Sequence, residues 1–106
     1  MSDWKDVCKL EKLVPGDWEM ADLEDTEVAV FNLDGKLYAI EDLCTHDGGY
    51  ITGGRVDGDQ ITCPRHNARF SVRNGACITA HAYEPISTYP VRVKDGMIQV
   101  MNQQQD

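Results

Sequence analysis

The chain has 106 residues, a length that accommodates one domain with one modest hydrophobic core. Its formal net charge of −8 disfavours nucleic acid and anionic membrane surfaces as partners, because both require a basic face. The longest wholly apolar run, Val28–Phe31, is far too short for a membrane span. We therefore expect a single domain over residues 1–106 that binds neither nucleic acid nor a membrane.

The predicted elements, taken in chain order, are short strands separated by turn residues. Segment 7–13 has room for one short helical turn before Pro15-Gly16, and no window of 11 residues shows convincing helical periodicity. The polar tail, residues 102–106, is expected to be frayed. The expected strands are 18–21, 27–33, 36–40, 55–56, 60–62, 89–93 and 97–100.

Four Asp-Gly or Asn-Gly pairs mark the turns between these segments: Asp34-Gly35, Asp57-Gly58, Asn74-Gly75 and Asp95-Gly96. Such pairs suit two-residue hairpin turns, in which both central residues need positive φ. Three of the four pairs separate two predicted strands. The sequence therefore predicts an all-β fold, a small sandwich or barrel of antiparallel strands.

Two short elements carry metal-ligand chemistry, Cys44-Thr45-His46 and Cys63-Pro64-Arg65-His66. Each begins where a predicted strand ends, and the hairpin at Asp57-Gly58 connects them, so both fall in loops within residues 43–70. Glycines are concentrated in the same stretch, as expected where backbone packs close to an inorganic core. These glycines are Gly48, Gly49, Gly53 and Gly54.

Three kinds of site are compatible with two cysteines and two histidines. A [2Fe–2S] cluster can be bound by two Cys at one iron and by two His at the other. Tetrahedral zinc also accepts this ligand set, although zinc fingers usually pair Cys with Cys and His with His near a helix. A catalytic Cys–His pair would leave one Cys and one His unexplained. His81 is the only other histidine in the chain, which is too few for an additional mononuclear iron site with two histidines.

The remaining cysteines, Cys8 and Cys77, occur in no ligand spacing. The first residues, Met1–Asp6, show neither the basic start nor the apolar stretch of a secretory signal, so the cytoplasm is the expected compartment. Cytosolic thiols stay reduced. We therefore expect Cys8 and Cys77 to be buried free thiols.

The two Cys/His elements, the glycine-rich stretch between them and Phe70 resemble a Rieske-type ferredoxin. The segments 31–39 and 88–91 resemble the same family, so the likeness covers most of the chain. It implies three antiparallel sheets, with one [2Fe–2S] cluster per chain at the tip of a small subdomain. By the same resemblance, Cys44 and Cys63 would bind the inner iron, and His46 and His66 the outer, solvent-facing iron.

The chain departs from the high-potential respiratory members of that family at four positions. Gly49 and Arg65 stand where those members carry a disulfide, and Ala68 and Phe70 stand where they carry Ser and Tyr hydroxyls. Hydrogen-bond donors near the sulfurs stabilise the reduced state. We therefore expect a reduction potential near the low end of the Rieske range, about −150 mV.

The resemblance implies an electron carrier rather than an enzyme, the ferredoxin component of a bacterial aromatic-ring-hydroxylating dioxygenase system. A monomeric carrier of this kind passes electrons from a flavin-dependent NAD(P)H ferredoxin reductase to a terminal oxygenase in aromatic hydrocarbon catabolism. Two alternatives remain open, a small Rieske subunit of a larger, nitrite-reductase-like enzyme and a zinc-binding interaction module.

The charges are unevenly distributed along the chain. Residues 1–42 contain 12 acidic and 4 basic residues, whereas residues 43–106 contain 6 of each. Four arginines, Arg55, Arg65, Arg69 and Arg73, lie near the proposed ligand segments. They either provide a docking surface for a partner or only promote solubility. We hypothesise that Arg65 contacts acidic groups on a partner.

Overall fold

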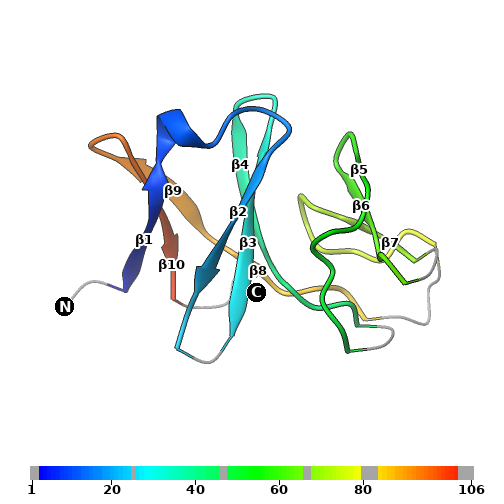
Figure 1. The fold of residues 1–106 in the computed structure, drawn as a ribbon. Helices are drawn as coiled ribbons and strands as arrows, with labels where there is room; N and C mark the ends of the chain where they lie inside the picture. The colour runs from blue at the N-terminus through cyan, green and yellow to red at the C-terminus, as the bar shows by residue number, and fades with distance from the viewer. Residues whose placement is uncertain (1–2, 25, 46–47, 66–67, 80–83, 103–106) are drawn as a thin grey trace.

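The computed structural model describes residues 3–24, 26–45, 48–65, 68–79 and 84–102, and it is built of antiparallel strands (Figure 1). The predicted all-β class is confirmed, and a single turn of 3₁₀ helix covers Leu10–Lys12. Within the described part of the chain, no helix has the length and apolar character that crossing a bilayer requires. The strands are β1 Trp4–Lys9, β2 Trp18–Asp22, β3 Glu27–Leu33, β4 Lys36–Glu41, β5 Val56–Asp57, β6 Gln60–Thr62, β7 Arg69–Ser71, β8 Thr88–Tyr89, β9 Val91–Lys94 and β10 Met97–Met101.

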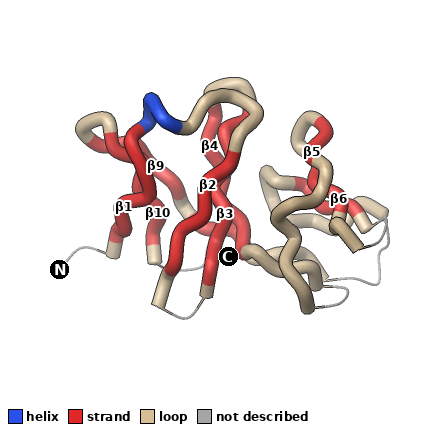
Figure 2. Tube along the Cα trace, in the orientation of Figure 1, coloured by secondary structure: helices blue, strands red, loops and turns tan. Residues whose placement is uncertain are grey.

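The strands form three sheets that lie side by side. The first has the order β1-β10-β9, the second β2-β3-β4-β8 and the third β5-β6-β7. Figures 1 and 2 show the third sheet as a separate subdomain in which most of the backbone is loop. This is the arrangement of three antiparallel sheets that the family resemblance implied.

Strand β3 lies between two hydrophobic cores, which explains the apolar run noted in the sequence. Successive side chains of a strand point to opposite faces. Val28 and Val30 pack with the first sheet, in a core that includes Ile98 and Val100. The other face of β3 contributes to the core of the third sheet, with Ala29 and Phe31 next to the two candidate ligand cysteines. The small subdomain therefore packs against one face of the middle sheet.

Two of the four predicted turns have the expected geometry. Asp34 and Gly35 have φ values of 54° and 93°, and Asp95 and Gly96 have values of 52° and 77°. The prediction for Asp57-Gly58 was wrong by one residue, because Asp57 pairs with Gln60 and leaves Gly58-Asp59 as the turn. Asn74-Gly75 follows β7 in a turn closed by the Gly75 N–H, which donates to the Ser71 carbonyl at 2.8 Å.

Strand β1 was not predicted. It pairs with β10 at the opposite end of the chain, and its register shifts between Asp6 and Cys8. This irregularity breaks the two-residue alternation by which a strand is recognised in a sequence. The predicted helical turn at 7–13 is confirmed only over Leu10–Lys12. The tail expected to be frayed lies, from residue 103 onward, outside the described residues.

Candidate metal centre

The two candidate ligand cysteines lie in one hydrophobic core. Cys44 follows β4 and is 0% exposed, and Cys63 follows β6 and is 2% exposed. Neither forms a disulfide, and both pack in the cluster that contains Phe31, Ile51 and Phe70. His46 and His66 lie outside the described residues, so the structure brings together only the cysteine half of the predicted ligand set.

The two cysteine loops are closed by equivalent hydrogen bonds. The Cys44 amide donates to the carbonyl of Gly49 at 2.7 Å, and the Cys63 amide donates to the carbonyl of Ala68 at 2.8 Å. Each bond spans five residues, and each loop contains one of the predicted histidines. The two Cys/His elements therefore resemble each other both in sequence and in the backbone hydrogen bond that closes each loop.

Asp42 holds the first loop and was not identified from the sequence. Its side chain is 7% exposed, and its Oδ1 accepts hydrogen bonds from the amides of Ile51 at 2.9 Å and Thr52 at 2.8 Å. The Thr52 hydroxyl donates to Oδ2 at 2.8 Å. A buried carboxylate bound by several donors is a strong local anchor. The only sequence feature that pointed to Asp42 was its position two residues before Cys44. That position alone does not distinguish a buried, hydrogen-bonded side chain from one in a solvated turn.

A second contact fastens the first loop to the C-terminal part of the chain. The Thr45 hydroxyl donates to the carbonyl of Glu84 at 2.6 Å. Thr45 lies between Cys44 and the residue predicted as the histidine ligand, so this bond fixes the backbone at that point. The loop is therefore held from two sides, at Thr45 and by Asp42.

Two glycines of this region lie close to other protein atoms, and two adopt positive φ. A Cβ atom on Gly54 would lie 1.8 Å from the carbonyl oxygen of Thr62, and one on Gly49 would lie 2.6 Å from the Arg65 Nη2. Gly48 and Gly53 adopt φ values of 77° and 90°, which few other residues tolerate. At Gly49 and Gly54 the structure shows close approach to Arg65 and Thr62, and the approach of this backbone to an inorganic core stays a prediction.

Arg65 connects the two loops. Its Nη2 donates to the carbonyl of Tyr50 at 2.7 Å and to the Cys63 Sγ at 3.3 Å. The guanidinium is permanently charged. A cationic donor directed at a buried cysteine sulfur complements the negative charge that this sulfur carries as a metal ligand.

The two positions predicted to lack hydroxyl donors are buried. Ala68 is 5% exposed and Phe70 is 0% exposed, and both belong to the core around the cysteines. Soft sulfur ligands in a dry pocket suit iron–sulfur or zinc chemistry. The donor chemistry of the described residues therefore fits a thiolate-bound metal centre. Among these residues no group of three or more His, Cys, Asp or Glu side chains forms a metal site by itself.

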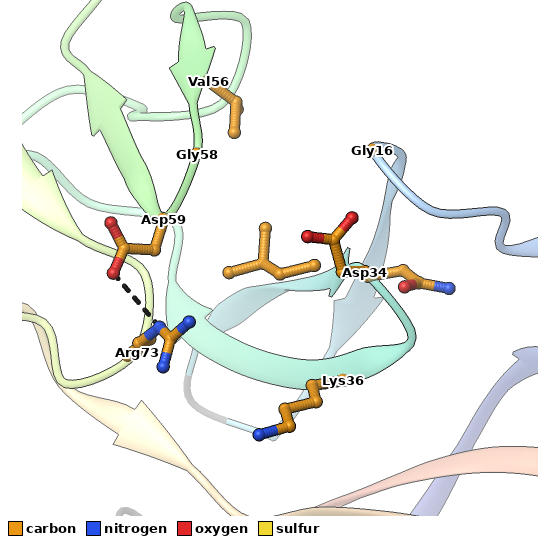
Figure 3. A pocket seen from close by; sticks show the side chains of 9 residues that line it. Gly16, Asp34, Lys36, Val56, Gly58, Asp59 and Arg73 are labelled. Atoms are coloured by element: carbon orange, nitrogen blue, oxygen red, sulfur yellow. Dashed lines mark ion pairs between the residues drawn. The ribbon is translucent and has the colours of Figure 1, made fainter.

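The two loop cysteines do not line the cleft between the middle sheet and the small subdomain. A cleft of about 690 Å³ lies between the β3–β4 turn and the small subdomain. Figure 3 shows Asp59 and Arg73, joined by an ion pair of 3.1 Å, on the opposite side of this cleft from Asp34. The cleft is lined by no cysteine. A second, shallower hollow of about 430 Å³ is lined by Cys63 and Arg65.

Cys8 and Cys77 are free, as predicted, but both are half-buried rather than buried. Cys8 lies in the irregular part of β1, and Cys77 forms an isolated bridge to Phe70. Burial, and to a smaller extent the charge of Glu19, raises the pKa of the Cys8 thiol above its usual value of 9.0, against the opposing effect of Lys12. Neither thiol has the geometry of the two loop cysteines.

Comparison with known proteins gives consistent matches over nearly the whole chain. The family model of the Rieske [2Fe-2S] domain matches residues 3–90. The ferredoxin component of the naphthalene 1,2-dioxygenase system of Pseudomonas putida is 31% identical over 97 residues, which are 92% of this chain and 93% of that protein. The 3-phenylpropionate/cinnamic acid dioxygenase ferredoxin subunit of Photorhabdus laumondii subsp. laumondii is 36% identical over 95 residues, 89% and 90% of the two chains.

A solved structure matches the complete chain. It is described as a complex of reduced oxygenase and oxidized ferredoxin in carbazole 1,9a-dioxygenase. The matching chain has a TM-score of 0.91 and 29% sequence identity, with 100% of this chain and 99% of that chain covered. The fold of the chain is therefore that of a known architecture.

Proposed function

Since the chain belongs to the Rieske [2Fe-2S] domain family, we propose that it is the ferredoxin of a bacterial ring-hydroxylating dioxygenase system. In this role it is an electron carrier and not an enzyme. The observation that supports this most directly is the pair of buried cysteines in equivalently closed loops, within a fold that such proteins share.

Four residues are proposed to hold one [2Fe–2S] cluster per chain, namely Cys44, His46, Cys63 and His66. When bound, the cluster supplies reversible one-electron storage. Cys44 and Cys63 are the ligands on the core side, because both are almost fully excluded from solvent. His46 and His66 follow within the same two loops and complete the mixed ligand set that the family uses.

The protein contributes a fixed and dry environment for this chemistry. The shape of the two loops is set by the backbone hydrogen bonds to Gly49 and Ala68 and by the side chain of Asp42. These contacts do not depend on the oxidation state of the cluster. A rigid site changes little between oxidation states, and burial of the ligand sulfurs limits the access of water. The whole of residues 1–106 is proposed to act as one domain in which the large sheets support the small subdomain.

The proposed partners are a terminal oxygenase and a flavin-dependent NAD(P)H reductase. The relatives are named for naphthalene and for phenylpropionate or cinnamic acid, and the solved complex contains an oxygenase for carbazole. These compounds are all aromatic but otherwise differ, so an aromatic ring is the substrate class we propose for the oxygenase. Monomeric state and a cytoplasmic location complete the proposal.

The test is an electron-transfer assay with the purified protein. We expect iron and acid-labile sulfide at about two atoms each per chain. A reductase and a terminal oxygenase of a related system should turn over together only when the holoprotein is added, with the apoprotein as the control. Bound zinc without sulfide would contradict the proposal. Isolation as a permanent, tightly bound subunit of a larger reductase would contradict the role of a free carrier.

A further inference from the structure

The guanidinium of Arg65 lies directly over the Cα atom of Gly49. A Cβ atom on Gly49 would be 2.6 Å from Nη2, 2.7 Å from Cζ and 3.1 Å from Nε of Arg65. The φ of Gly49 lies outside the left-handed range, so its backbone conformation does not require glycine. A side chain at this position would meet the end of the flexible Arg65 side chain and displace its guanidinium.

The same guanidinium is held by both loops. Nη2 donates to the Tyr50 carbonyl at 2.7 Å, which ties the second loop to the first. It also donates to Cys63 Sγ at 3.3 Å, within the range of a hydrogen bond to sulfur. Gly49 and Arg65 are the two positions at which the sequence comparison placed the missing disulfide. In the high-potential respiratory members, a disulfide joins the two loops here. In this chain, hydrogen bonds of Arg65 join them instead.

The contact with Cys63 has an electrostatic consequence. A hydrogen bond from a charged donor strengthens as the acceptor becomes more negative. An added electron raises the negative charge on the ligand sulfurs, so a cationic donor stabilises the reduced state more than the oxidised state. The sequence suggested that donors are missing because Ala68 and Phe70 replace hydroxyls. Arg65 supplies a donor from a different position.

We propose that Arg65 is a positioning residue that raises the reduction potential of the cluster by donating to Cys63 Sγ, and that Gly49 provides the space this requires. The inference rests on the proposed function, since it needs a cluster bound by Cys63. It differs from the earlier hypothesis that Arg65 contacts a partner, because the effect is intrinsic to the isolated protein.

The experiment is a redox titration of isolated holoprotein, followed by its visible and EPR spectra. At the midpoint potential of the wild type, the ratio of reduced to oxidised Arg65→Gln protein should fall about tenfold, which is about 59 mV for one electron. Arg65→Lys should lie between the two, because it keeps the charge but not the planar fork. Gly49→Ala should shift the potential in the same direction as Arg65→Gln, since its methyl group displaces the guanidinium without removing it.

Arg69→Gln is the matched control, because it removes an equal charge from an exposed arginine on β7. Its midpoint should stay at the wild-type value. The double variant Gly49→Ala/Arg65→Gln should shift no further than Arg65→Gln alone. A wild-type midpoint in Arg65→Gln, or equal shifts in Arg65→Gln and Arg69→Gln, would overturn the inference while the proposed function stands. The proposed function itself fails if the wild type shows no reversible one-electron couple.

Discussion

Asp42 accepts both the amide and the hydroxyl hydrogen bond of Thr52, each at 2.8 Å, through its two different carboxylate oxygens. The same carboxylate accepts the amide of Ile51, which is fully buried. Three donors from one turn thus converge on a side chain that directly precedes the first cysteine loop. The shape of that loop therefore depends on the Asp42 carboxylate.

Replacing Asp42 with alanine should loosen the first loop. The buried Ile51 amide would lose its partner, a cost of about 2 kcal/mol in the free energy of local opening. Hydrogen exchange followed by mass spectrometry should therefore show the amides of residues 51 and 52 exchanging roughly thirtyfold faster. Asp42→Asn should have a smaller effect, because it keeps one acceptor oxygen. Asp57→Ala, at an exposed carboxylate, should leave this segment unchanged, and unaltered exchange in Asp42→Ala would refute the anchor.

Substitution of Gly54 by alanine should damage the second loop. The added Cβ would lie 1.8 Å from the Thr62 carbonyl, so the backbone next to Cys63 has to move. Overpacking of this kind costs about 2–3 kcal/mol. We expect lower thermal stability and a lower iron content per chain. Gly16→Ala is the comparison, because it is strained at φ 91° but meets nothing within 4 Å and lies far along the chain from both loops. It should lose stability and keep its iron.

The contacts of Arg73 should contribute little to stability. Its Nε lies 3.1 Å from Asp59 Oδ2, and its Cζ lies 5.8 Å from the centre of the Tyr38 ring. Both members of the ion pair are about half exposed, at 55% and 43%. Arg73→Gln should therefore lower the free energy of unfolding by less than about 1 kcal/mol, and the difference should shrink at high salt. A larger loss that persists at high salt would show that the arginine holds the two subdomains together.

The raised pKa of Cys8 predicts a slow and pH-dependent reaction with alkylating agents. Burial and the charge of Glu19 disfavour the thiolate in the folded protein. The unfolded chain loses this proton first as the pH rises, so the contribution of the group to stability is complete below pH 9 and declines above it. Iodoacetamide labelling with peptide mapping should show faster modification of Cys8 in Glu19→Gln. Equal rates in the two proteins would show that Glu19 does not act on Cys8.

Much of the fold could be predicted because its signals are local. Strand β3 is an apolar run, and the hairpin turns at Asp34-Gly35 and Asp95-Gly96 need only two residues of the right type. Strand β1 could not be predicted, since its partner β10 lies about 90 residues away and a bulge disrupts its pattern. The one-residue error at Asp57-Gly58 has a similar origin, because the pairing of Asp57 with Gln60 decides the turn.

In the candidate site, too, features with a local sequence signal could be predicted, and contacts between distant residues could not. Cys44 and Cys63 were predicted as ligands from short motifs. The structure buries both in one core, and their role as ligands stays a prediction. The supporting contacts were missed, because Asp42 with Thr52 and Arg65 with Gly49 join residues 10 and 16 positions apart in loops without periodicity. The hypothesis that Arg65 contacts a partner did not include the hydrogen bonds of its guanidinium to Tyr50 and Cys63.

The central claim is that two thiolates and two imidazoles share one iron–sulfur cluster. It is tested most directly by electron–nuclear double resonance of the dithionite-reduced protein after labelling with ¹⁵N-histidine. We predict hyperfine couplings from two imidazole nitrogens, one lost in His46→Gln, one lost in His66→Gln and both retained in His81→Gln. Reduced protein with an iron–sulfur signal but without any histidine nitrogen coupling would contradict the claim.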